Sequence, residues 1–182
     1  MNLVNEKENS FDVDHLVNEL KAAALNENAA EKVKTILQEV VTNPEKLATI
    51  PSFEDKDVIL FEDETVSIWH CRFAVGQTVP AHDHQMVTTV AVYEGIERNE
   101  IWLKNEDGDL QKKADVNVSA GDVLQMGPND IHSVSCGSDI DSQAIHVYLG
   151  ELTTVERSLF DPQSGEVMGF DDDNYYRLTR SE

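Results

Sequence analysis

Two histidines separated by one residue, His82 and His84, are the side chains in this sequence with the clearest potential for chemistry. On an extended strand, side chains at positions i and i+2 project to the same face, so both imidazoles can reach one metal ion. Pro80 blocks a helix just before them, and the β-branched and aromatic residues at 87–93 are typical of a half-buried strand. The spacing therefore predicts two metal ligands at the entrance of a strand.

A third histidine, His132, follows a strand-like run and the turn signal Gly127-Pro128. Such a turn would bring its side chain from the opposite edge of a barrel toward the same interior. Three neutral imidazoles on one side of a metal leave positions open for water, substrate or oxygen. Structural zinc sites are usually closed by four ligands, often including cysteine, so an open set of three histidines favours catalysis.

Short β-rich runs separated by turn residues follow residue 51, and they are the elements that must position these histidines. Strands at such regular spacing predict an all-β sandwich or barrel. The predicted strands are residues 58–61, 65–73, 87–93, 97–103, 116–118, 123–125, 131–135 and 144–149.

Two helices are predicted before the strands. Apolar residues recur at helical spacing over residues 13–25 and 28–41. We therefore expect residues 1–50 to form a helical segment that packs on the barrel, and residues 51–182 to form the barrel with an acidic C-terminal tail. Within that tail, Tyr175 and Tyr176 either attach it to the barrel or lie in a solvated charged strip.

The composition narrows the choice of partners. A formal net charge of −21 and an isoelectric point near 4.4 repel nucleic-acid phosphates and anionic lipid surfaces, so neither nucleic acid nor a membrane is an expected partner. Only two cysteines are present, which excludes a disulfide framework. Residues 1–15 show no basic stretch followed by an apolar core, and no run of 18 apolar residues occurs in the sequence. We expect a soluble, cytoplasmic protein that is a monomer or a homodimer.

The segment PAHDH at residues 80–84, Gly95 eleven residues after the second histidine, and G-x5-GPxxxH at residues 121–132 together resemble the two motifs of the cupin superfamily. Most cupins place a glutamate a few residues after the second histidine, whereas residues 85–89 read QMVTT. The missing carboxylate resembles the branch of cysteine and 3-mercaptopropionate dioxygenases, which bind Fe(II) with three histidines and convert a thiol to a sulfinic acid. The resemblance covers residues 61–170 and implies an all-β cupin jelly roll, also called a double-stranded β-helix.

The resemblance also implies roles for individual residues. His146 and Tyr148 correspond to the catalytic histidine and tyrosine of a Ser-x-His-x-Tyr relay in this family, but Ala144 stands at the position of the serine. Thr88 or Thr89 stands where the animal enzymes carry a cysteine crosslinked to the tyrosine, so no crosslink is implied. The implied Fe(II) ligands are His82, His84 and His132.

A carboxylate clamp is the remaining feature of the family, and Arg157 matches its placement nine residues after Tyr148. A guanidinium suits a carboxylate because it offers planar, bidentate donors. Arg72 and Arg98 are further candidates for this role, although both are also typical of surface residues. Thiolate sulfur is a soft ligand that loses its proton on coordination, and neutral histidines leave the metal cationic enough to accept it.

Structural roles remain open for several of these residues. Tyr148 and His146 alternate along one strand and can simply fill the barrel. Asp83 should point away from the metal and fix the strand by hydrogen bonding. Non-ligand roles are expected for His15 and His70, and roles as small apolar side chains for Cys71 and Cys136.

The leading hypothesis is an Fe(II) dioxygenase that adds O2 to a small mercapto-carboxylate, such as 3-mercaptopropionate or cysteine. A cupin enzyme acting on a non-thiol substrate is the first alternative, and the departure at Ala144 motivates it. A non-catalytic, metal-dependent module that binds small molecules is the second. Zinc or nickel in the native protein would favour the binding module, since zinc has no accessible redox chemistry.

Overall fold

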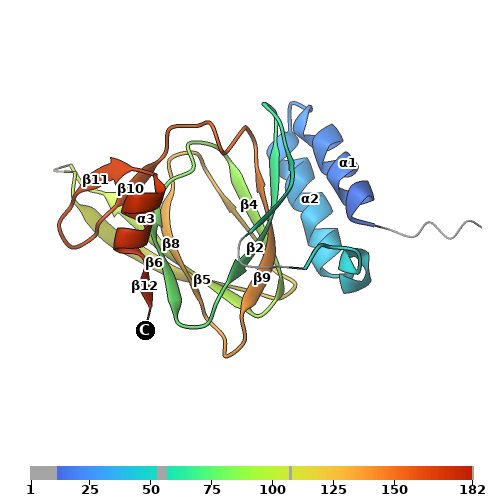
Figure 1. The fold of residues 1–182 in the computed structure, drawn as a ribbon. Helices are drawn as coiled ribbons and strands as arrows, with labels where there is room; N and C mark the ends of the chain where they lie inside the picture. Colours follow the sequence, from blue (N-terminus) through green and yellow to red (C-terminus); the bar gives the residue numbers. More distant parts are fainter. Residues whose placement is uncertain (1–11, 53–56, 107, 182) are drawn as a thin grey trace, which may run out of the picture.

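The computed structural model describes residues 12–52, 57–106 and 108–181, which form two antiparallel β-sheets with a helical pair against one of them (Figure 1). The elements in chain order are α1 (Val13–Ala24), α2 (Ala29–Val41), η1 (Pro44–Leu47), β1 (Val58–Glu62), β2 (Ser67–Phe73), β3 (Gln77–His82), β4 (Thr88–Glu94), β5 (Ile96–Lys104), β6 (Leu110–Ser119), β7 (Val123–Met126), β8 (Ile131–Cys136), β9 (Ser142–Tyr148), β10 (Ser158–Phe160), β11 (Val167–Gly169), α3 (Asp172–Leu178) and β12 (Arg180–Ser181).

The strand order identifies the architecture. One sheet runs β1-β2-β9-β4-β7 and the other runs β11-β10-β3-β8-β5-β6, with β12 also paired to β3. The strands β2 to β9 are thus divided between two facing sheets of four, in the orders β2-β9-β4-β7 and β3-β8-β5-β6. This arrangement of eight strands is a jelly roll. The predicted all-β jelly roll with two N-terminal helices is confirmed.

The N-terminal helices cover the outer face of the first sheet. Leu16, Leu20 and Leu37 are fully buried and share one apolar cluster with strand residues such as Ile145 and Val147. Side chains alternate along β9, so Ile145 and Val147 face the helices. His146 and Tyr148 therefore face the barrel interior. The helices therefore bury the second face of the sheet that carries candidate site residues.

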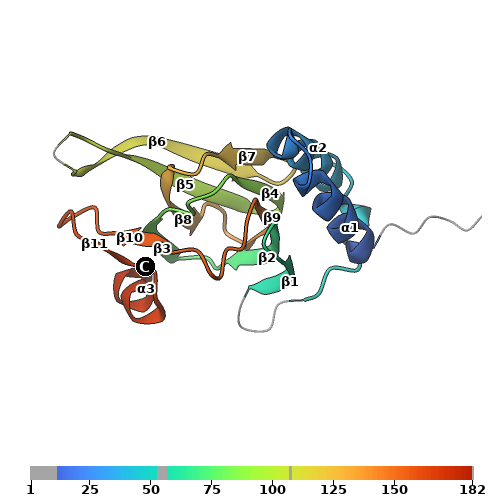
Figure 2. The ribbon, with the colours of Figure 1, turned by 90° about the horizontal axis from the view of Figure 1, so that it is seen from above.

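The C-terminal segment lies away from the N-terminal helices, as two perpendicular views show (Figures 1 and 2). Its α3, β10 and β11 were not among the predicted elements. Asp171 caps α3, since its side chain accepts a hydrogen bond from the backbone N–H of Asn174 at 2.8 Å. Asp172 and Asp173 occupy the first helical turn, where negative charge is favourable. The acidic run therefore begins a helix. Its Tyr175 is half-buried, with its ring centroid 5.7 Å from that of Phe170, while Tyr176 is exposed.

Strand β6 is longer than the sequence predicts, extending from Leu110 to Ser119 instead of over residues 116–118. Its N-terminal half, with Gln111, Lys112 and Lys113, is exposed and charged, as is common on an edge strand. The backbone pairs with β5 along the whole length, so charged side chains there do not interrupt the strand.

Replacing Leu37 with alanine should lower the free energy of unfolding by about 2–5 kcal/mol, because a fully buried side chain is removed from the helix–sheet core. The matched control is Leu25→Ala, just after α1, whose side chain is 74% exposed. Its effect should stay within about 0.5 kcal/mol. Urea denaturation followed by circular dichroism measures both. Equal effects would mean that the helices do not stabilise the barrel.

Candidate metal centre

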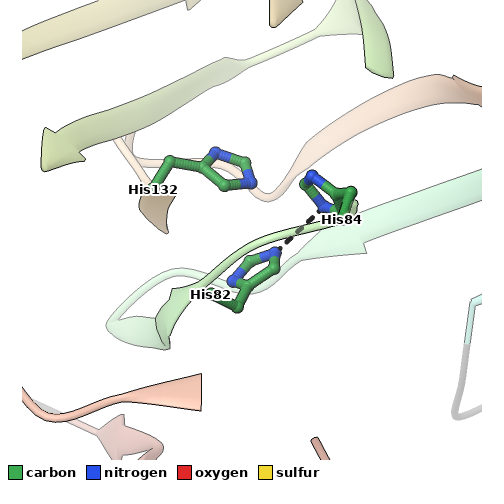
Figure 3. Close-up of side chains that lie close together, drawn as sticks. All are labelled: His82, His84 and His132. Atoms are coloured by element: carbon green, nitrogen blue, oxygen red, sulfur yellow. Dashed lines mark hydrogen bonds between the residues drawn. The ribbon is translucent and has the colours of Figure 1, made fainter. Parts of the chain in front are cut away.

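Three buried histidines meet inside the barrel, and their rings point toward one another (Figure 3). His82 ends β3 and pairs in register with His132 on β8, while His84 lies in the loop that follows β3. One ring nitrogen from each lies within 4.8 Å of the others. The Nε2 atoms of His82 and His84 are 3.2 Å apart. That separation suits neighbouring ligands of one ion, which lie about 2.9–3.4 Å apart when each metal–nitrogen bond is about 2.1 Å.

The first two histidines face one site, as their i, i+2 spacing predicts, but they lie at the end of a strand and not at its entrance. The prediction placed both at the entrance of a strand, whereas His82 is the last residue of β3 and His84 lies beyond it. The chain turns sharply there, because Gln85 adopts a left-handed conformation with φ of 57°. The side chain of Gln85 donates to Asp83 Oδ2 at 2.7 Å. His82 and His84 thus face the cluster while Asp83 between them bonds to Ser158, as alternation predicts, and the turn at Gln85 follows them.

Hydrogen bonds hold two of the imidazoles in one tautomer. His82 donates its Nδ1–H to the carbonyl of Pro80 at 2.8 Å, and His132 donates its Nδ1–H to Asn99 Oδ1 at 2.7 Å. The Nε2 lone pair of each ring is therefore directed into the site. The Nε2 atom of His132 is buried and has no hydrogen-bond partner among the described residues. A buried lone pair without a donor is what a metal ion would satisfy, so the three residues fit one.

Burial keeps these histidines neutral. Desolvation lowers the pKa of His82 to about 4 and the pKa values of His84 and His132 well below the ordinary 6.5. The positive charge of Arg157 lowers the pKa of His82 and His84 further. Neutral imidazole is the form that binds metal ions, so the site needs no deprotonation at neutral pH.

His146 and Tyr148 lie on the interior face of β9, next to the histidine cluster. The ring centroid of Tyr148 is 5.1 Å from that of His84, and its hydroxyl lies 3.1 Å from Nδ1 of His146. Burial raises the pKa of Tyr148 well above 10, which keeps the phenol protonated. Ala144 is buried in a neighbouring apolar cluster and offers no hydroxyl to His146. The two residues of the implied relay are therefore placed beside the cluster.

Glu97 and Asn99 are site residues that sequence reasoning missed. Both are fully buried on β5, and their side chains bond to His146 and His132 respectively. The only available signal was their spacing, since residues i and i+2 of a predicted strand share a face. Glutamate and asparagine in a strand are usually read as solvent-facing, which hid their position in the barrel.

Arg157 is half-buried, and its guanidinium carbon lies 3.8 Å from the centroid of the Phe170 ring. Phe170 in turn contacts His82, with ring centroids 5.7 Å apart. Asp83 holds this segment in place, because its Oδ1 accepts the backbone N–H of Ser158 at 2.9 Å. As predicted, Asp83 thus makes its hydrogen bonds away from the cluster. Desolvation lowers the pKa of Arg157, and no ion pair with a carboxylate is formed by it in the part of the chain that the structure describes.

The remaining candidates lie elsewhere. Arg72 is 3.9 Å from Asp141, and Arg98 is 3.1 Å from Asp115; both arginines form these ion pairs with partly exposed side chains. His70 bonds to the hydroxyl of Tyr93 and not to the cluster. His15 is exposed and lies apart from the histidine cluster. The thiol of Cys71 is buried, and that of Cys136 is partly buried.

No protein-family model matches the sequence, and no curated protein matches it either. Among solved structures, a double-stranded β-helix protein of Klebsiella pneumoniae is 13% identical with a TM-score of 0.45, over 60% of this chain and 84% of its own. An RmlC-like cupin of Methanocaldococcus jannaschii is 14% identical with a TM-score of 0.45, over 56% and 90%. A DMSP lyase of Ruegeria pomeroyi is 17% identical with a TM-score of 0.42, over 56% and 46%.

The fold is a jelly roll. The strand order alone defines it. None of the helices in the described ranges is both long and apolar enough to cross a membrane.

Lowering the pH from 7 to 5 should destabilise the metal-free jelly roll. The folded state holds His82 with a pKa of about 4, whereas the unfolded chain takes up a proton near 6.5, so stability is present above 6.5 and is lost toward 4. For His82 alone the loss at pH 5 is on the order of 2 kcal/mol. Urea denaturation of EDTA-treated protein measures it. His82→Gln should reduce the pH dependence by its own share and His15→Gln should not; a stability independent of pH would contradict the assignment.

Proposed function

We propose that this protein is a mononuclear non-haem iron thiol dioxygenase that converts a small mercapto-carboxylate, 3-mercaptopropionate or cysteine, to its sulfinate. The observation that carries the proposal is the convergence of three buried, neutral histidines with no carboxylate in their group among the described residues. A protonated tyrosine and a half-buried arginine flank that group. Together these features supply a metal site with open positions and a recognition element for one end of the substrate.

His82, His84 and His132 would hold the metal, and the chemistry that an Fe(II) ion supplies when bound is electron transfer between a thiolate and O2. The overall reaction balances as R–SH plus O2 giving R–SO2H. No external reductant is needed, because the sulfur provides all the electrons. Buried Met86 and Leu152, which pack around Tyr148, help to keep water from the reacting sulfur.

Arg157 would bind the carboxylate of the substrate. The guanidinium is already partly desolvated and oriented by the ring of Phe170, so little is lost when it pairs with a carboxylate. The link between Asp83 and Ser158 joins the arginine-bearing segment to the loop of the histidines. A substrate that spans a short distance between a thiol and a carboxylate fits this arrangement.

Tyr148 would orient the oxygen or the substrate. Its raised pKa keeps the phenol hydroxyl protonated, and its ring lies against His84. The bond to His146 limits the rotation of that hydroxyl. The phenol therefore contributes a fixed dipole at the edge of the cluster.

The departure from the family pattern at Ala144 favours one other function, that of a cupin enzyme acting on a non-thiol substrate. The small apolar side chain removes the serine hydroxyl of the relay. The third candidate function is a metal-dependent module that binds small molecules without converting them.

Metal analysis of anaerobically purified protein, followed by oxygen-electrode assays, tests the proposed function. We expect iron and thiol-dependent O2 uptake with 3-mercaptopropionate or cysteine, and a sulfinate product by mass spectrometry. Uptake with a non-thiol alone would support another cupin chemistry. Iron-loaded protein that consumes no O2 with any thiol would refute the dioxygenase, and native zinc or nickel would favour the binding module.

Arg157→Gln should raise the KM for a carboxylated thiol about 10- to 100-fold, since a charge-assisted hydrogen bond contributes about 1.5–3 kcal/mol. The kinetics with cysteamine, which has no carboxylate, should change little. Arg98→Gln is the matched control, because Arg98 lies on the surface beside Asp115. An equal loss with both thiols would assign Arg157 a structural role instead of substrate recognition.

A further inference from the structure

A continuous chain of hydrogen bonds crosses the barrel interior and connects two sides of the histidine cluster. His132 bonds to Asn99 at 2.7 Å, and Asn99 Nδ2 lies 3.2 Å from Glu97 Oε1. The other carboxylate oxygen, Glu97 Oε2, lies 3.1 Å from His146 Nε2, and His146 Nδ1 lies 3.1 Å from the hydroxyl of Tyr148. All five side chains are buried, so solvent does not compete for these bonds.

This chain has two arms that meet at Glu97: the His132 arm runs through Asn99, and the Tyr148 arm runs through His146. The chemistry of Asn99 fixes the direction of the hydrogen bonds in the His132 arm. Its amide oxygen faces His132 and accepts the Nδ1–H, so its NH2 group faces Glu97 and can only donate. His146 in turn gives its Nε2–H to the second oxygen of Glu97, which leaves Nδ1 to accept the hydroxyl proton of Tyr148. Both arms therefore end on Glu97 as their common acceptor.

We infer that Glu97 is the positioning residue of this site: it fixes the tautomer of His132 through Asn99 and the orientation of Tyr148 through His146. Its carboxylate makes the hydrogen bond to His146 that Ala144 cannot make. One residue thus directs the lone pair of His132 into the metal site on one side and fixes the phenol oxygen of Tyr148 on the other. Only the part concerning Tyr148 rests on the proposed function.

The burial of the pair supports a role beyond packing. Glu97 and Asn99 are fully inaccessible to solvent, in a barrel whose neighbouring interior positions are Val90, Val92 and Val118. A buried carboxylate is unfavourable unless every oxygen has a donor, and Glu97 has one on each oxygen. Apolar residues would fill the same space without this requirement.

A glutamine at position 97 provides a sharp test, because it keeps the shape and removes one acceptor. If its amide oxygen faces His146, its NH2 group opposes the NH2 group of Asn99, and Asn99 must rotate and present a donor to His132. If the oxygen faces Asn99 instead, the NH2 group opposes Nε2–H of His146. One of the two histidines must therefore change tautomer in Glu97→Gln.

The first measurement is the tautomeric state in the full-length, 15N-labelled, metal-free protein, by long-range 1H–15N correlation. The wild type should show His132 protonated at Nδ1 and His146 protonated at Nε2. In Glu97→Gln one of these assignments should reverse. Glu100→Gln is the control, because Glu100 lies on the same strand but pairs with Lys112. Unchanged tautomers in Glu97→Gln, or a wild-type His132 protonated at Nε2, would overturn the inference.

The second measurement is the affinity for Zn(II), by competition with a chelating dye. Loss of a partner that orients a histidine ligand lowers metal affinity about 10- to 100-fold. Asn99→Ala should cause this loss and leave the tautomer of His146 unchanged, which provides a test even if Glu97→Gln does not fold. Wild-type affinity in Asn99→Ala would overturn the His132 arm.

These readouts separate the inference from the proposed function. Tautomers and Zn(II) affinity do not depend on thiol oxidation, so a protein that fails to consume O2 leaves them interpretable. With active protein, Glu97→Gln should lower kcat more than it raises the KM for the thiol, because Tyr148 loses its fixed orientation while Arg157 is unchanged. A change in KM alone would contradict the Tyr148 arm.

Discussion

The need to satisfy every buried imidazole N–H is the constraint on which the site depends. A histidine can direct one nitrogen lone pair into a dry cavity only if its other nitrogen donates to a fixed acceptor. Pro80 provides that acceptor for His82, and Asn99 provides it for His132. The backbone carbonyl needs no further support, whereas the asparagine needs a partner for its NH2 group. That need accounts for a fully buried glutamate inside the jelly roll.

The N-terminal helices contribute to the chemistry through burial. Strand β9 carries His146 and Tyr148 on one face and Ile145 and Val147 on the other, and α1 and α2 cover the latter. With both faces of this sheet covered, its interior side chains are removed from water. Desolvation is the largest cause of the lowered histidine pKa values and of the raised pKa of Tyr148. Elements with no reactive residue therefore help to set the protonation state of the site.

Periodicity and turn residues were sufficient to predict most of the barrel, and motif spacing was sufficient to bring the three histidines together. They failed where polar residues have structural roles. The acidic run at Asp171 begins a helix, and the lysines of β6 lie on an edge strand. Glu97 was missed because its hydrogen-bond partner, His146, is 49 residues away in the sequence. Contacts of that kind become visible only when the sheets are placed face to face.

Arg157 is a half-buried cation in a strongly acidic chain. Acidic residues outnumber Lys and Arg by 35 to 14, and several cations, such as Arg98 and Lys112, pair with a carboxylate. Arg157 stacks on Phe170 instead and forms no such pair among the described residues. The carboxylates of Asp83 and Glu62 offset only part of the desolvation of this guanidinium, and a directly bound carboxylate would offset more of it. The same acidic surface repels anions at long range, so an anionic substrate would gain its affinity from this local pairing and not from electrostatic steering.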